Sequence, residues 1–185
     1  MRRHRILATA TVGLVAAAAS SGCRAPTQLQ LEVTTTLSCS EVAGLTIAVA
    51  ETASRAEADV ATRAFAAQSD ACAKSGSLGS LIVTPGSPTG AITIVVGYRG
   101  ADGSGKIARD CLPPRYEGCI VARRRFAFVD HTTLRLPVVM DPQCRDVACE
   151  ALSTCFRGVC VSSEVACDGD ACGLEVERPG GGLDA

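Results

Sequence analysis

The sequence predicts a mostly β protein, an antiparallel β-sandwich followed by a small disulfide-rich C-terminal module. Between residues 29 and 140, short apolar runs alternate with polar residues at a period of two, and turn residues separate the runs. This pattern is typical of sandwich strands. After residue 140, six cysteines fall within 29 residues, a density typical of small secreted modules. In strand count the sandwich is expected to be immunoglobulin-like or transthyretin-like, although the chain has no Trp.

The N-terminus has the three parts of a secretory signal peptide. Three arginines precede a 14-residue apolar run over residues 6–19, and the small residues 20–22 follow. The run is shorter than the roughly 20 residues that a membrane-spanning helix needs. We therefore expect residues 1–22 to direct export.

Cys23 is the candidate site of lipid attachment. The pair Gly22-Cys23 resembles a bacterial lipobox, although Ser20 stands where a Leu is usual. Without Cys23, ten of the 11 cysteines remain, and ten can pair completely. The alternative is ordinary cleavage near Ala19, which would leave Cys23 as an odd thiol. Lipidation would anchor the chain to a membrane surface, at the outer membrane or periplasmic face. Ordinary cleavage would make it periplasmic or extracellular.

The sandwich domain is expected over residues 29–142, after a tether at 23–28. Pro137 cannot donate to a ladder, so it predicts an edge or a bulge in its strand. Asp130-His131 is expected to be a tight turn. Residues 56–68 are ambiguous, because their alanines favour helix while alternation favours strand, and we expect a strand or a loop. The expected strands span residues 29–34, 45–49, 78–84, 91–98, 119–129 and 133–140.

The disulfide-rich module is expected over residues 143–174, with a flexible tail at 175–185. Its cysteines are spaced C-x4-C-x5-C-x4-C-x6-C-x4-C and have few apolar neighbours. An exported chain keeps such cysteines oxidised, while the spacing leaves their connectivity open. The residues expected to form disulfides are Cys39, Cys72, Cys111, Cys119, Cys144, Cys149, Cys155, Cys160, Cys167 and Cys172.

Several segments of the mature chain resemble one group of bacterial proteins. They are GSLIVTP at 79–85, GCIVARR at 118–124, and LRLPVVM at 134–140 leading into the spaced cysteines 144–160. The chain resembles the predicted cysteine-rich envelope lipoproteins of myxobacteria and related bacteria. That resemblance implies a lipid-anchored or secreted domain of unassigned activity and no catalytic residues.

The sequence contains no pattern that predicts a metal site or a catalytic site. Zinc sites favour closer cysteine pairs, often with His, and His131 is the sole His of the mature chain. The acidic turn at 168–173 lacks the later oxygen ligands of a calcium loop. His131 beside Asp130 does not form a triad, and no G-x-S-x-G elbow is present. We expect no catalytic residues, no metal and no cofactor.

The run Arg123-Arg124-Arg125 is the one dense basic cluster. It could form a patch for an acidic glycan, a lipid headgroup or a nucleic acid. The mature chain from Cys23 has 15 basic and 19 acidic residues, a net charge of −4, and few aromatics. We therefore expect a solvated strand face whose long stems cover apolar neighbours, and no nucleic-acid partner.

These observations predict an exported, lipid-anchored cell-envelope protein with a non-catalytic structural or interaction role. Its partners would be the membrane surface and an unknown envelope or extracellular molecule. The alternative is a secreted inhibitor or ligand that acts through the C-terminal disulfide knot, with residues 150–154 as its presented loop. A further alternative is an enzyme centred on His131.

Overall fold

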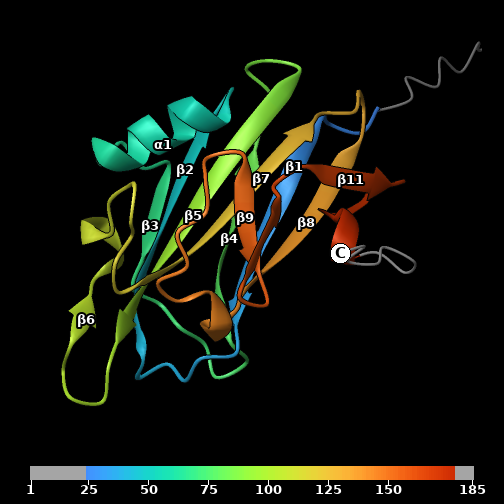
Figure 1. The fold of residues 1–185 in the computed structure, drawn as a ribbon. Helices are drawn as coiled ribbons and strands as arrows, with labels where there is room; N and C mark the ends of the chain where they lie inside the picture. The colour runs from blue at the N-terminus through green and yellow to red at the C-terminus, as the bar shows by residue number, and fades with distance from the viewer. Residues whose placement is uncertain (1–23, 178–185) are drawn as a thin grey trace, which may run out of the picture.

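The computed structural model describes residues 24–177, which form β-sheets and one α-helix (Figure 1). The prediction of a mostly β protein is confirmed. The finer assignment to an immunoglobulin-like or transthyretin-like sandwich stays a prediction. No helix within the described residues is long and apolar enough to cross a membrane.

The first sheet has the strand order β11-β12-β8-β1-β4. Strand β1 pairs antiparallel with β4 but parallel with β8, which differs from the expected antiparallel arrangement. The parallel pairing is possible because most of the chain lies between β1 and β8, and a long connection can return the chain in either direction. The strands are β1 Gln28–Thr35, β4 Ser77–Val83, β8 Thr133–Met140, β11 Val165–Asp168 and β12 Ala171–Leu174.

The second sheet is built around β5, which pairs with β2 on one edge and with β7 and β6 on the other. A separate hairpin of β9 and β10 lies beside β7, where the Arg123 amide donates to Thr154 Oγ1 at 2.9 Å. The strands are β2 Val42–Ala50, β3 Ala67–Ser69, β5 Thr89–Arg99, β6 Gly105–Lys106, β7 Cys119–Ala127, β9 Ser153–Phe156 and β10 Val159–Ser162. Short 3-10 helices span η1 Ala108–Asp110, η2 Pro142–Cys144 and η3 Glu175–Glu177.

One hydrophobic core lies between the two sheets. Its members alternate along each strand as the sequence pattern requires, for example Leu29 and Leu31 on β1 facing Ile92 and Ile94 on β5. These side chains are at most 1 % exposed, and burying each contributes about 1.5–3 kcal/mol. The four core cysteines Cys144, Cys149, Cys155 and Cys172 join the same cluster.

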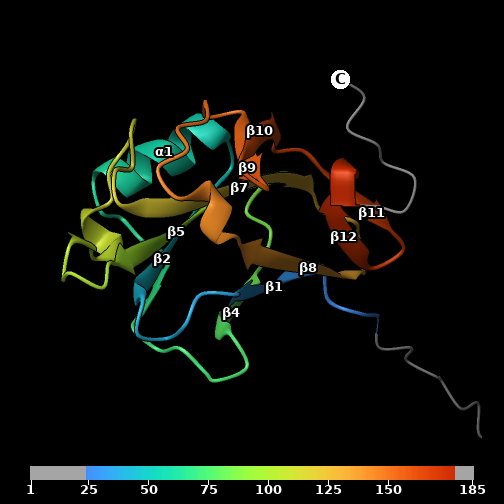
Figure 2. The ribbon, with the colours of Figure 1, turned by 60° about the horizontal axis from the view of Figure 1, so that its bottom comes forward.

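Residues 53–61 form a helix, α1 (Ala53–Ala61), which includes the first part of the segment 56–68 that was expected to be a strand or a loop. Thr52 caps it by accepting a hydrogen bond from the Arg55 amide at 3.3 Å. Ala53, Ala56 and Val60 are its buried residues, and their spacing is that of one helix face. Figure 2 shows α1 on the side of β2 and β5 that faces away from β1, β8 and β4. The expectation was wrong for residues 56–61, because alanine propensity and this buried stripe outweighed a chance alternation. It holds for the rest of the segment, since residues 62–66 form a loop and residues 67–68 belong to β3.

Pro137 lies on β8, which the sheet order places between β12 and β1, so β8 is not the edge strand that Pro137 predicted, although within the described residues it has no partner on the β12 side beyond Arg135. Strand β12 pairs with β8 only at Arg135, whose amide donates to the Asp170 carbonyl at 2.6 Å. Backbone groups of alternate residues point to the same side of a strand. The backbone nitrogen of Pro137 therefore points to the same side as that of Arg135, where β12 no longer pairs with β8, so no hydrogen bond between the strands is lost.

Candidate functional site

Five disulfide bonds join Cys39–Cys72, Cys111–Cys119, Cys144–Cys155, Cys149–Cys160 and Cys167–Cys172. The prediction of a cysteine-rich, disulfide-bonded chain is confirmed, and the structure supplies the connectivity that the spacing left open. So many disulfides suggest an oxidising environment outside the cytoplasm. Cys23 and the signal peptide lie outside the described residues.

His131 lies in the predicted turn after β7 and is exposed. Its Nε2 is 3.1 Å from Arg24 Nη1, and its amide donates to Thr27 Oγ1 at 2.8 Å. No pocket described below includes it. Within residues 24–177, no group of three or more His, Cys, Asp or Glu side chains is placed to hold a metal ion.

The arginine run on β7 is mostly buried, so the expectation of a solvated strand face was wrong. Arg123 is 4 % exposed and Arg124 is 2 % exposed, whereas Arg125 is partly exposed. The alternation of β7 sends Arg123 to the outer face of the second sheet, beneath α1, and Arg124 to the opposite face. Alternation assigns Arg124 to a different face from Arg123 and Arg125, but no signal in the sequence predicts their burial, because it depends on segments distant in the chain.

Arg123 belongs to a polar cluster that ties α1 to the second sheet. Its Nε donates to Glu57 Oε1 at 2.8 Å, and its guanidinium lies 5.3 Å from the centre of the Tyr116 ring. Tyr116 and Thr93 also donate to the Glu57 carboxylate, at 2.7 and 3.0 Å. The carboxylate therefore accepts from three side chains on three segments.

The protonation of this cluster follows from its contacts. Burial by itself raises the pKa of the Glu57 carboxyl, but the hydrogen bond and charge of Arg123, with the two hydroxyl donors, outweigh it and lower that pKa. Burial, and then Glu57, raise the pKa of the Tyr116 hydroxyl, so Tyr116 remains a donor. The cluster is an internal salt bridge that holds α1 in place, and the Glu57 carboxylate accepts four hydrogen bonds from Arg123, Tyr116 and Thr93.

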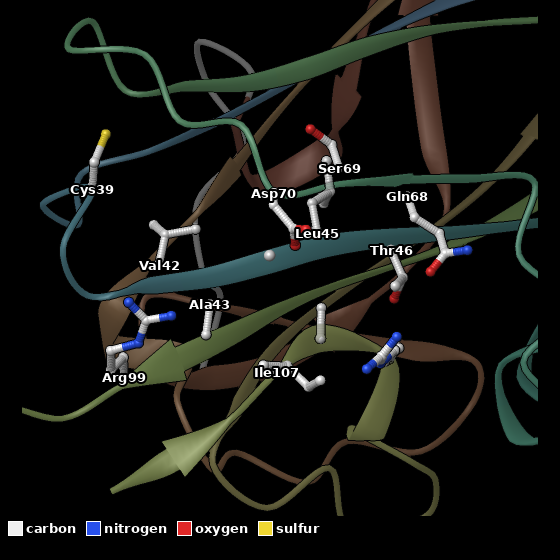
Figure 3. Close-up of a pocket in the computed structure, with 13 residues that line it drawn as sticks. Cys39, Val42, Ala43, Leu45, Thr46, Gln68, Ser69, Asp70, Arg99 and Ile107 are labelled. Atoms are coloured by element: carbon white, nitrogen blue, oxygen red, sulfur yellow. The ribbon is translucent and has the colours of Figure 1, made fainter. Parts of the chain in front are cut away.

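A polar pocket of about 640 Å³ opens on the outer face of the second sheet, beside η1. Figure 3 shows Asp70 and Gln68 on one side of β2, and Arg99 and Ile107 on the other. The segment after β3, the end of β5 and η1 thus form its walls. The lining residues are Cys39, Val42, Ala43, Gly44, Leu45, Thr46, Gln68, Ser69, Asp70, Arg99, Ile107, Ala108 and Arg109.

The polar pocket contains polar groups that the described part of the chain leaves without partners. Thr46 is 2 % exposed, and its Oγ1 has no hydrogen-bond partner in the structure. Within residues 24–177, the side chains of Asp70, Arg99 and Arg109 make no ion pair or hydrogen bond. A buried hydroxyl without a partner is uncommon and costs about 1–3 kcal/mol.

Disulfides and backbone packing hold the polar pocket in shape. Cys39–Cys72 joins the segments before β2 and after β3, and Cys111–Cys119 ties the chain after η1 to β7. Gly97 has no room for a side chain, since a Cβ there would lie 2.4 Å from the Ala43 carbonyl oxygen. No local motif marks these residues in the sequence, because they come from four separate segments.

The loop proposed for an inhibitor, residues 150–154, packs back onto the sheet. Thr154 is fully buried and accepts the Arg123 amide, and the Leu152 carbonyl accepts from the Ser163 amide at 3.0 Å. Leu152 is the large apolar side chain that the loop exposes, and Glu150 is exposed as well. In the second half of the loop, these hydrogen bonds hold the chain against the sheet, so a partner could not bind that part of the backbone.

Fold and bonding define residues 24–177 as a disulfide-rich, mostly β structure, and disulfides flank its polar pocket. Comparison of the chain with protein-family models, with curated proteins and with solved structures finds no match. The chemistry of the chain's own residues therefore carries the functional argument.

Proposed function

We propose that the chain is an exported, lipid-anchored protein of the bacterial cell envelope with a non-catalytic binding role. The basic and apolar N-terminal segment supports export, and Gly22-Cys23 supports the lipid anchor. The five disulfides are consistent with a compartment outside the cytoplasm. The resemblance to cysteine-rich envelope lipoproteins points the same way.

The observation that carries the binding role is the polar pocket with its partnerless groups. Asp70 offers a negative charge, Arg99 and Arg109 offer positive charges, and the buried Thr46 hydroxyl can donate or accept. A ligand that carries both an ammonium group and an oxyanion, such as a free amino acid or a short peptide, could pair with the acid and the bases and hydrogen-bond to the hydroxyl. Disulfide-fixed walls lower the entropic cost of binding such a ligand.

A thermal-unfolding titration with glutamate, arginine and glycylglycine tests the polar pocket. A ligand at about ten times its Kd stabilises the folded state by about 1.4 kcal/mol, which for a chain of this size raises Tm by roughly 3–6 °C. Asp70→Asn should abolish the shift, whereas Asp130→Asn makes the same charge change in a turn outside the pocket and should preserve it. If no probe raises Tm, or if both variants respond alike, the polar pocket is not the binding site.

Membrane fractionation tests the anchor in the native host. The Cys23→Ser variant removes the only thiol that an acyl chain could use at this position, so the protein should move from the membrane fraction to the soluble fraction. The wild type should remain with the membrane after a wash in high salt, which removes proteins held by charge alone. Unchanged membrane retention of the variant would contradict lipid anchoring.

A further inference from the structure

A second hollow lies on the far side of the molecule, where β8 and the C-terminal strands separate. It is a groove of about 850 Å³, within the range of small-molecule sites. Its apolar wall comes from β8 and the β9–β10 hairpin and includes Pro137, Val139 and Phe156. Val139 is 52 % exposed there. The groove exists because β12 leaves the edge of β8 after a single paired position.

Arg124 lines this groove although it is 2 % exposed. Its Nη1 donates to the Arg123 carbonyl at 2.9 Å and to Thr154 Oγ1 at 3.2 Å, so that nitrogen is fully used. Its Nε is buried and has no hydrogen-bond partner. Burial lowers the pKa of Arg124 to about 10, so the guanidinium remains charged at neutral pH.

The Nε and Nη2 side of the Arg124 guanidinium, which donates no hydrogen bond to the described part of the chain, is a side that commonly binds carboxylates. Nε–H and the adjacent Nη2–H point in the same direction and form the fork that matches the two oxygens of a carboxylate. The nearest acid is Glu177, whose Oε1 lies 3.8 Å from Nη2, beyond hydrogen-bond distance. Glu177 is held back because its Oε2 accepts the Leu174 amide at 2.9 Å. The buried guanidinium of Arg124 thus has Glu177 as a counter-ion, but its Nε–H and Nη2–H donate no hydrogen bond to it.

We propose that the groove binds a carboxylate with an apolar body, with the carboxylate in the Nε/Nη2 fork of Arg124. The two oxygens would satisfy the partnerless Nε and displace Glu177 toward solvent, where its side chain is already 27 % exposed. The apolar body would cover Val139 and Phe156. The acids Asp141 and Asp168 and the base Arg157 also line the groove. Their net negative charge disfavours small bare anions, so the apolar contact is needed for binding.

Hexanoate is the probe, and the Nε–H signal of Arg124 in a ¹H–¹⁵N correlation spectrum of the whole mature protein is the readout. A ligand of this size is expected to bind with Kd of about 1 mM and to shift that signal saturably. Hexanamide has the same body without the charge and should leave the signal in place. The Arg124→Lys variant assigns the signal by its loss.

Two variants separate ligand binding from a structural role of the arginine. Glu177→Gln removes the competing carboxylate and should tighten hexanoate binding by about fivefold or more, followed on the Arg124 signal. Arg124→Lys keeps the charge but loses the fork, and should weaken binding about tenfold, followed on the Val139 amide signal. Asp130→Asn is the charge control and should change nothing.

The proposal is overturned if hexanoate moves the Arg124 signal no further than hexanamide does. It is also overturned if Glu177→Gln leaves the affinity unchanged, or if all arginine signals shift together. None of these outcomes involves a residue of the polar pocket, so they leave the proposed function untouched.

Discussion

Removal of the Glu57 carboxylate should strongly destabilise the folded protein. In Glu57→Gln the Arg123 guanidinium, 5 % exposed, loses the one ion-pair partner that it has within residues 24–177. Breaking a buried pair by removing one partner costs about 3–5 kcal/mol, because the remaining charge is buried without compensation. The Gln side chain keeps one acceptor oxygen, which places the expected loss near the lower end, at about 3 kcal/mol.

Urea unfolding followed by circular dichroism measures this loss, and a neighbouring ion pair supplies the control. Glu164 pairs with Arg125 at 3.3 Å, but its side chain is 73 % exposed, so Glu164→Gln should cost less than about 1 kcal/mol. For a chain of this size, 3 kcal/mol lowers Tm by roughly 6–12 °C. Equal effects of the two variants would refute the reasoning, because burial would then make no difference.

A double variant and a pH series complete the test. Glu57→Gln with Arg123→Met removes both charges and should be more stable than Glu57→Gln alone. The pKa of Glu57 is lowered in the folded state from its ordinary value of 4.5. Its contribution is therefore fully present above that value and is lost as the pH falls through the folded-state pKa. The acid-side loss of stability should be shallower in Glu57→Gln, and an identical pH profile would contradict the assignment.

Two further changes probe the frame of the polar pocket. Replacing Cys39 and Cys72 by Ala removes a disulfide that joins residues 33 positions apart. The lost loop-closure entropy should lower the free energy of unfolding by about 3.7 kcal/mol, measured from the urea midpoint. A loss below about 1 kcal/mol would contradict that account. Gly97→Ala puts a Cβ within 2.5 Å of three backbone atoms and should lower the free energy of unfolding by about 3 kcal/mol. In the control Gly86→Ala, the added Cβ meets nothing within 4 Å, so its stability should be within about 0.5 kcal/mol of the wild type. Similar midpoints for the two alanine variants would show that the close backbone packing can relax.

Local patterns sufficed for much of the fold. Alternation located β1, β2, β4, β5, β7 and β8. Alternation misled at residues 56–61, which belong to α1, because their Ala-rich sequence also fits a helix and packing against the second sheet decides between the two. The parallel partner of β1 could not be read from the sequence, since pairing between distant strands leaves no local trace.

The candidate sites were beyond the reach of such patterns. Arg123 and Arg124 are adjacent, yet one is neutralised by Glu57 from a helix and the other faces a groove beside Glu177. Their partners lie 66 and 53 residues away in opposite directions along the chain. Residue type and spacing along one strand carry no information on such contacts.

The parallel pairing of β1 with β8 has a consequence for the order of folding. Thr35 and Met140 meet across a separation of 105 residues, so β1 cannot complete its pairing with β8 until the chain as far as residue 140 is present. Contacts of this range slow folding, because loop closure must precede the gain from pairing. A chain that crosses a membrane from its N-terminus would therefore hold β1 unpaired on one side during transit. A chaperone that binds this segment would shorten the time for which it can aggregate.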